Sequence, residues 1–305
     1  MSRNFTEEIK YQWNHGGTHI KLIGINLAVF LLIRILLSIG GLMGQEAEFN
    51  ISYILNQIFV LHGDLSGLLT HPWGIVTSIF AHYDTMHLLF NMVFLFFSSQ
   101  MFLQFFSSKR LLYVYVVGGI FGGLVQIIAH QVFPGLQNTS IYVVGASGSI
   151  MAIFLSLAFH RPNAKVHLFG VFPVRIIYLG LLFILQDFLG MGKNDGIAHF
   201  AHLGGALLGY LSVQKPNSPK NIINWIQITV ENLFNKKSTP RGSRSKMKVV
   251  KNKSYNTKSD EDYREFKKTE QEQVDAILMK IKKAGYDSLT KREKEILFEY
   301  SRNVK

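Results

Sequence analysis

Long apolar segments recur through the first 213 residues of the chain, and they constrain its fold more than any other feature. The segments cover residues 20–43, 86–106, 111–133, 144–159, 174–190 and 197–213. A helix of about 20 apolar residues crosses a bilayer, and a chain in lipid must satisfy its backbone hydrogen bonds internally. The pattern therefore predicts an all-α, polytopic membrane protein with six transmembrane helices. The first segment starts too far into the chain, and runs too long, for an ordinary cleaved signal peptide, so we expect it to be retained.

Charge divides the chain into two parts of different character. Residues 1–213 hold 10 Lys/Arg and 8 Asp/Glu, a net charge of +2, whereas residues 214–305 hold 22 and 12, a net charge of +10. This contrast is typical of a membrane domain followed by a basic soluble tail. The chain has no cysteine, which excludes disulfides, thiol catalysis and cysteine-based metal sites.

Basic residues between the apolar segments predict the orientation in the membrane. Lys109 and Arg110 follow the second segment, and Arg161, Lys165 and Arg175 follow the fourth. The connections after the first, third and fifth segments are nearly free of basic residues. Because basic loops stay in the cytoplasm, we expect both termini to be cytoplasmic, in a membrane of the bacterial inner-membrane type.

The stretch at residues 45–84 carries short apolar patches broken by histidine, glycine and proline. It is too broken to span a bilayer and too apolar for a free loop, so we place it at the membrane interface. We expect His71 and His82 to be interface residues rather than ligands.

One serine lies among small residues at the start of the fourth segment. Gly145, Ala146 and Gly148 flank Ser147 in the sequence VVGASGSIMAIF, so the backbone around its hydroxyl is uncrowded. A hydroxyl at this place serves either close helix packing or nucleophilic chemistry, and its immediate neighbours do not decide between the two.

Three other polar side chains are expected at the depth of Ser147. His202 lies roughly one and a half turns into the sixth segment, and His87 and Asn91 lie one turn apart at the start of the second. In the predicted orientation all four groups fall in the outer leaflet. Polar and ionisable groups inside a membrane are candidates for function.

Small residues spaced four apart predict close helix packing around these groups. Gly205 and Gly209 have this spacing in the sixth segment, and two glycine pairs repeat it in the third. Such faces let helix backbones approach closely, which would help a histidine on one helix to reach a serine on another. We expect Gly145 and Gly148 to pack near the same site.

Three motifs lie on three of the predicted helices: HLLFN at residues 87–91, GASG at 145–148 and AHLGG at 201–205. In this order, with six predicted spans, they resemble the rhomboid family of intramembrane serine proteases over roughly residues 70–210. The family's paired basic and aromatic motif in the first outer loop is not obvious in this chain, so we assign no role on that basis.

The resemblance implies a serine–histidine dyad. Ser147 would be the nucleophile and His202 the general base, with no carboxylate to orient it. His87, Asn91 and the backbone N–H of Ser147 would donate hydrogen bonds to the oxyanion of the tetrahedral intermediate. The resemblance also implies substrates that are single-pass membrane proteins, entering near the second and fifth spans.

Two acids and a second histidine lie near this set in the sequence. We expect Asp187 in the fifth span and Asp195 in the following outer loop to be paired or solvated rather than part of a triad. His202 fits the family pattern, and for His199 we expect a cavity-facing or interface position. The histidine pairs lack a carboxylate and a third ligand, so we expect no metal, and no cofactor is implied.

The predicted parts of the chain are a cytoplasmic lead at 1–19, a membrane protease domain at 20–213, a basic linker at 214–268 and a small helical hairpin at 269–305. Within the linker, residues 222–234 predict an amphipathic helix on the inner leaflet. Residues 236–258 should be disordered and attracted to anionic lipid. We expect no nucleic acid to bind, because no aromatic interleaving or fold motif accompanies the charge.

Capping signals define the terminal hairpin. Gly285 is expected to end its first helix, and Thr290 with Glu293 forms a capping box before its second. The hairpin has no catalytic residue that the sequence identifies, and its partner cannot be predicted.

We therefore expect an intramembrane serine endopeptidase that cuts transmembrane helices near the outer face, with membrane-helix proteins and lipids as its partners. Two alternatives stay open. One is a catalytically inactive rhomboid-like protein that binds membrane helices. The other is a small-solute transporter that uses the same polar residues as a pathway.

Overall fold

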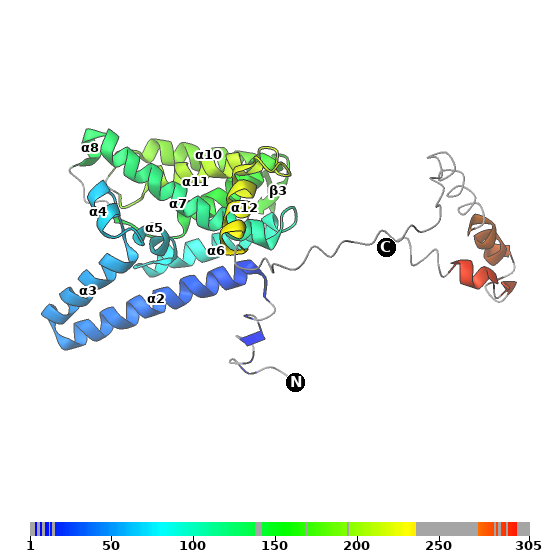
Figure 1. The fold of residues 1–305 in the computed structure, drawn as a ribbon, viewed down its shortest axis with the longest axis horizontal. Helices are drawn as coiled ribbons and strands as arrows, with labels where there is room; N and C mark the ends of the chain where they lie inside the picture. The colour runs from blue at the N-terminus through cyan, green and yellow to red at the C-terminus, as the bar shows by residue number, and fades with distance from the viewer. Residues whose placement is uncertain are drawn as a thin grey trace, which may run out of the picture. The chain divides into compact units, whose positions relative to one another are not determined.

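A computed structural model of the chain describes two compact units, Met1–Ser238 and Thr239–Lys305. The described residues are 4, 7, 10, 11, 13, 16–137, 142–168, 170–193, 195–235, 274–283, 285, 288–290 and 292–297. Figure 1 shows the long helices of the first unit lying side by side as a bundle.

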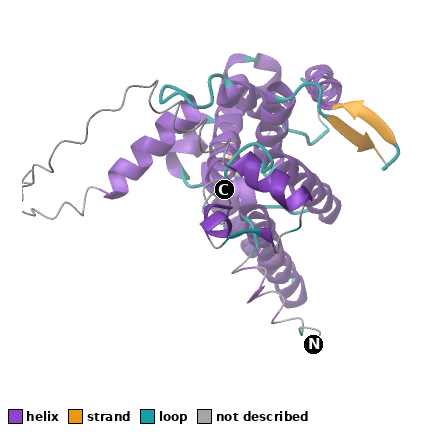
Figure 2. Ribbon diagram, turned by 90° about the vertical axis from the view of Figure 1, so that its right-hand side faces the viewer, coloured by secondary structure: helices purple, strands orange, loops and turns teal. Residues whose placement is uncertain are grey.

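The Met1–Ser238 unit consists of helices with two pairs of short strands. Its longer helices are α2 (Thr18–Met43), α3 (Gln45–Phe59), α6 (Thr85–Phe102), α7 (Ser108–Val132), α9 (Ser147–His160), α10 (Ile176–Gly190), α11 (His199–Val213) and α12 (Ile222–Asn235). The shorter ones are α4 (Leu65–Thr70), α5 (Gly74–Thr77), η1 (Ser78–Phe80) and α8 (Pro134–Gln137). The antiparallel strand pairs are β1 (Leu61–His62) with β2 (Tyr142–Val143), and β3 (Lys165–Leu168) with β4 (Phe172–Arg175). The predicted all-α class is confirmed, and the strand pairs are additions; Figure 2 shows the β3–β4 pair extending away from the helices.

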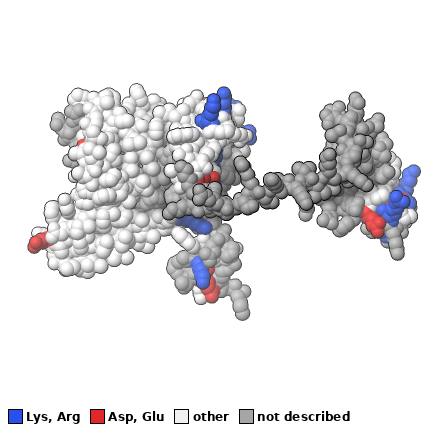
Figure 3. All heavy atoms as spheres, in the orientation of Figure 1, with Lys and Arg blue, Asp and Glu red and all other residues white. Residues whose placement is uncertain are grey.

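Each of the six predicted apolar segments coincides, to within a few residues at its ends, with one helix, namely α2, α6, α7, α9, α10 and α11. Among the described residues, α2, α6 and α7 are long and apolar enough to cross a membrane, while α9 and α10 are apolar but shorter. Charged side chains on the visible face of this unit gather near its ends and leave its long middle uncharged (Figure 3). The chain is a multi-pass membrane protein, and a count of six spans stays a prediction.

Helix α9 is the centre of the bundle. Its residues 148–158 are all buried, and α6, α7, α10 and α11 pack around it. A helix that is apolar on every side can be buried in this way without exposing a polar face. Glycine permits the closest approaches: a Cβ on Gly205 of α11 would lie 2.1 Å from the carbonyl oxygen of Gly148, and one on Gly118 of α7 would lie 2.4 Å from Cβ of Ala152.

Arg110 joins the start of α7 to the chain that follows α11. Its buried guanidinium donates hydrogen bonds to the carbonyl oxygen of Ser212, to Oδ1 of Asn221 at 3.1 Å and to Oδ1 of Asn224 at 2.8 Å. These charge-assisted bonds hold the first turn of α12 against the bundle. The helix predicted at residues 222–234 is therefore present and packed on the membrane domain.

The Thr239–Lys305 unit contains the predicted capping features. Residues 274–283 and 292–297 are helical, and Gly285 has a φ of +80° with its N–H donating to the carbonyl oxygen of Ile281 at 2.8 Å. The Thr290 N–H donates to a Glu293 carboxylate oxygen at 2.7 Å, and the Glu293 N–H donates to Thr290 Oγ1 at 3.3 Å. The predicted C-cap and capping box are confirmed, whereas the expected disorder of 236–258 lies outside the described residues.

We predict that Gly205→Ala destabilises the bundle by about 1–3 kcal/mol, because α9 and α11 must separate to admit the methyl group. Unfolding in detergent, followed by tryptophan fluorescence during denaturant titration, measures this change. Gly41→Ala is the matched control, since the nearest atom to its added Cβ is 3.7 Å away. Equal stability of the two variants would contradict the predicted role of the α9–α11 contact.

Candidate active site

The irregular chain before α9 holds Ser147 at the first position of that helix. Val143 pairs with Leu61 across the β1–β2 ladder, and the Gly145 N–H donates to the carbonyl oxygen of Ser78 at 2.9 Å. Gly145 has a φ of +116°, a backbone conformation that L side chains rarely adopt. Glycine at this position lets the chain turn sharply into α9, so the Ser147 hydroxyl faces a cavity instead of the helix interior.

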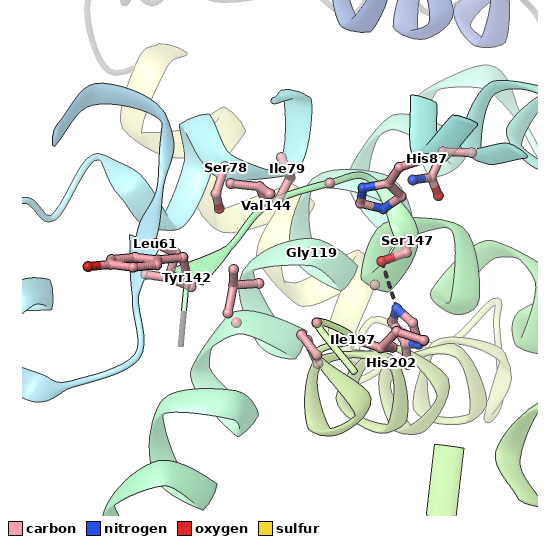
Figure 4. Close-up of a pocket in the computed structure, with 18 of the residues that line it drawn as sticks. Leu61, Ser78, Ile79, His87, Gly119, Tyr142, Val144, Ser147, Ile197 and His202 are labelled. Atoms are coloured by element: carbon pink, nitrogen blue, oxygen red, sulfur yellow. Dashed lines mark hydrogen bonds between the residues drawn. The ribbon is translucent and has the colours of Figure 1, made fainter. Parts of the chain in front are cut away.

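His202 in the first turns of α11 contacts this hydroxyl. Its Nε2 lies 2.7 Å from Ser147 Oγ, and the dashed line in Figure 4 marks this hydrogen bond. The close approach of Gly205 to Gly148 brings the two helices together beside the pair. A hydroxyl within hydrogen-bond reach of an imidazole is the arrangement that activates a serine as a nucleophile.

A carboxylate lies on the other side of His202. Asp187 Oδ1, on α10, is 2.9 Å from His202 Nδ1 and 2.8 Å from His199 Nδ1. The expected pairing of Asp187 is present, but the expectation that no carboxylate would orient His202 is wrong. Whether Asp187 reaches His202 depends on the rotation of α10 about its axis, which the sequence does not specify. The sequence did indicate a functional role for Asp187, because it is an acid within an otherwise apolar span.

His199 is buried and lies between two acids instead of facing the cavity. Its second ring nitrogen, Nε2, is 3.1 Å from Oδ2 of Asp195, which also accepts a hydrogen bond from the Ile197 N–H at 3.0 Å. Neither ring nitrogen of His199 contacts Ser147 in the structure. The choice of His202 over His199 as the partner of the serine agrees with this geometry.

His87 and Asn91 on α6 line the same cavity as Ser147 and His202. The Asp84 side chain accepts a hydrogen bond from the His87 N–H at 2.7 Å and so caps α6 at this point. Figure 4 shows His87 and His202 on opposite sides of Ser147. The cavity has a volume of about 320 Å³, and it is lined by residues of several helices and of the chain before α9.

His82 is part of this site, although we expected it at the membrane interface. Its side chain is completely buried, and its Nε2 lies 3.1 Å from Asn91 Nδ2 and 3.4 Å from the Ala146 backbone nitrogen. Burial lowers the pKa of His82 to about 4, with a further contribution from neighbouring His87. The ring is therefore neutral at pH 7, so Nε2 accepts a hydrogen bond from Asn91 and leaves the second Nδ2 hydrogen available for another acceptor.

Within the part of the chain that the structure describes, one group could hold a metal ion. The candidate ligand atoms of Asp187, His199 and His202 lie within 4.8 Å of one another. Each of these ring nitrogens already has a hydrogen-bonding partner, and His202 faces Ser147 with its other nitrogen. The expectation that the histidine pairs lack a carboxylate and a third ligand is therefore wrong for His199 and His202, which both contact Asp187.

Comparison with protein families gives two matches. The description "Rhomboid domain" applies to residues 69–214, which include the site residues above, and "Family of unknown function (DUF6576)" applies to residues 257–303. The second match covers the described helices of the Thr239–Lys305 unit and adds no activity to it.

Individual relatives are similar over the same region. The Putative rhomboid protease YdcA of Bacillus subtilis is 32% identical over 144 residues, covering 47% of this chain and 68% of the relative. The Rhomboid protease GlpG of Haemophilus influenzae is 30% identical over 144 residues, covering 46% and 67%. The mitochondrial RHOMBOID-like protein 12 of Arabidopsis thaliana is 26% identical over 193 residues, covering 60% of this chain and 57% of the relative, so this chain spans little more than half the length of that protein.

We predict that a serine-directed fluorophosphonate reacts with Ser147, because His202 Nε2 is placed to take the hydroxyl proton as fluoride leaves. His202→Ala should slow labelling by about 10²–10⁴-fold, and Ser147→Ala should abolish it. In-gel fluorescence and mass spectrometry of the labelled peptide measure the rate and the site. Ser149→Ala, which removes a buried hydroxyl two residues away, is the control, and label on any residue but Ser147 would refute the assignment.

Proposed function

We propose that this chain, which belongs to the rhomboid family, is an intramembrane serine endopeptidase that hydrolyses peptide bonds in or near the transmembrane helices of single-pass membrane proteins. The observation that carries the proposal is the 2.7 Å contact between Ser147 Oγ and His202 Nε2 at a cavity inside a multi-pass membrane protein. The protease names of two relatives support the same reaction.

In this reaction Ser147 Oγ attacks the carbonyl carbon of the scissile bond while His202 Nε2 takes its proton. His202 then gives that proton to the nitrogen of the leaving peptide, and the remaining peptide is an ester on Ser147. In the second half, His202 takes a proton from water as the water oxygen attacks the ester carbon. Return of the proton to Ser147 releases the second product and restores the pair.

Negative charge on the carbonyl oxygen needs donors in both halves of the reaction. His87, Asn91 and the backbone N–H of Ser147 are our proposed donors, since all three residues line the cavity. The Ser147 N–H also lies at the N-terminus of α9, where the unpaired N–H groups of a helix favour an anion. The bond between Asn91 and His82 supports this role by orienting the amide in advance.

A transmembrane substrate reaches such a cavity from the side. We propose that it enters between α6 and α10, because α10 exposes Leu182, Leu185 and Phe188, an apolar face that suits lipid or a substrate helix. The six predicted spans with both termini in the cytoplasm put the cavity near the outer face. That orientation stays part of the proposal.

We predict that the purified protein in liposomes cleaves a generic single-pass reporter, with cleavage followed by gel electrophoresis. Ser147→Ala and His202→Ala should each lower cleavage by at least about 10³-fold, because each removes one half of the nucleophile–base pair. Ser149→Ala should cleave like the wild type. Cleavage that survives in Ser147→Ala would contradict the proposal, and a wild type that neither cleaves nor labels would favour the inactive, helix-binding alternative.

We predict that Asn91→Ala lowers kcat by about 10²–10³-fold with little change in KM, since an oxyanion donor acts mainly in the transition state. Reporter cleavage at varied substrate density in the membrane gives both constants. Asn26→Ala is the control, because Asn26 is another buried asparagine, on α2, with hydrogen bonds to Leu22 and Tyr115. An equal fall in kcat for Asn26→Ala would show that the effect of Asn91→Ala comes from impaired folding.

A further inference from the structure

We propose that Asp187 is a positioning residue for His202, and that His199 and Asp195 hold Asp187 in place. The inference rests on the proposed function, because it concerns how the base of that reaction is kept ready. It adds three residues to the site and links Ser147 to the connection between α10 and α11 through a continuous chain of hydrogen bonds.

The first step is the tautomer of His202. An ionised carboxylate only accepts hydrogen bonds, so His202 Nδ1, at 2.9 Å from Asp187 Oδ1, carries the proton. The lone pair then lies on Nε2, which is 2.7 Å from Ser147 Oγ. Asp187 therefore selects the form of the imidazole that can take the serine proton, and its negative charge favours the cation formed on proton transfer.

The second step is the position of Asp187 itself, which is 6% exposed. A buried carboxylate is stable only when it is paired and hydrogen-bonded. His199 and His202, three residues apart on α11, both approach the same oxygen, Oδ1, from one side of the helix. Two donors from one helix fix the carboxylate more narrowly than His202 alone would.

The third step is the role of Asp195. His199 faces carboxylate oxygens with both ring nitrogens, and it donates to both only when both carry a proton. His199 thus links the buried carboxylate of Asp187 to Asp195, with one ring nitrogen within hydrogen-bonding distance of each. The Ile197 N–H and the His199 ring hold the pKa of Asp195 below its ordinary value, so this end of the chain stays ionised.

Glycine on α10 makes room for this arrangement. A Cβ on Gly190 would lie 2.2 Å from Cε1 and 2.3 Å from Nε2 of His199. Any larger residue at position 190 would displace the His199 ring. Gly190→Ala therefore disturbs the support of Asp187 without removing any hydrogen-bonding side chain.

The main test separates positioning from folding by following fluorophosphonate labelling to completion. Asp187→Asn should lower the rate constant of labelling and kcat for the reporter by about 10²–10⁴-fold, as loss of the aspartate does in other serine-protease triads. The final fraction labelled, the unfolding midpoint and KM should change little. A purely structural role would lower the final fraction and leave the rate constant of the folded molecules unchanged, and this result would overturn the inference.

A second pair of variants tests the positioning role if Asp187→Asn does not fold. Gly190→Ala should slow labelling at least about fivefold, whereas Gly180→Ala, on the same helix but against Leu155 and Ala158, should not. The labelling rate of Asp195→Asn should lie between the rates of Gly190→Ala and Gly180→Ala. Equal rates for Gly190→Ala and Gly180→Ala would overturn the inference.

Two further results distinguish the positioning of His202 from loss of the whole reaction and from metal binding. If the wild type is neither labelled nor able to cleave the reporter, the proposed function is refuted. If the wild type is active and the labelling rate of Asp187→Asn lies within twofold of the wild-type rate, only the positioning role is refuted. Labelling by the wild type should be unchanged by a chelator. A fall in the labelling rate on addition of the chelator would show that Asp187, His199 and His202 hold an ion, and this result would overturn the inference.

Discussion

Close contact between the backbones of α9 and α11 is the interaction on which the site depends. In a bilayer, apolar side chains gain little free energy by exchanging contacts with lipid for contacts with protein. Helices therefore associate where small residues allow close packing. Gly205 contacts the Gly148 backbone, and one turn further Gly209 contacts the Ala152 carbonyl oxygen. Beyond these, Ser156 and Ser212 share a hydrogen bond at 2.7 Å between the same two helices. The 2.7 Å distance between serine and histidine is thus a result of how the two helices are clamped along their length.

The short helix η1, which precedes α6, also supports the site. Ser78 holds the loop that carries the nucleophile, and the carbonyl oxygen of neighbouring Ile79 accepts a hydrogen bond from the Tyr115 hydroxyl at 3.0 Å. Asn26 in turn donates to that hydroxyl at 3.0 Å, so α2, α7 and the loop form one connected structure. The stretch at residues 45–84, which we expected at the membrane interface, therefore contains residues that support the site.

The six apolar helices were predictable because they depend on local patterns. The pairing of Ser147 with His202 was instead expected from the resemblance of three motifs to a known family. Apolar length located the six long apolar helices to within a few residues, but it did not predict α3, which lies in the stretch expected at the interface. The spacing of small residues around Ser147 and Gly205 indicated which faces pack. Contacts that depend on helix rotation were not predictable. Asp187 had no visible partner in the sequence, because its neighbours lie on another helix. His82 was misplaced for a similar reason, since nothing near it in the sequence indicates that the chain folds back against Asn91.

The β3–β4 pair was missed because its residues mix polar, apolar and turn-forming types within a short connection. Its strands are held by backbone pairing from Lys165 with Arg175 to Leu168 with Phe172, which depends on register more than on composition. Short strands between membrane helices carry too few residues for an alternating pattern to be distinctive.

The separation of Ser147 and His202 by 55 positions has a consequence for biosynthesis. A ribosome delivers the serine long before the histidine, and the glycine face of α11 that clamps the two helices arrives with the histidine. A chain that lacks α11 consequently holds Ser147 without its histidine partner. The pair on which the proposed function depends is then assembled only when α11 packs against α9.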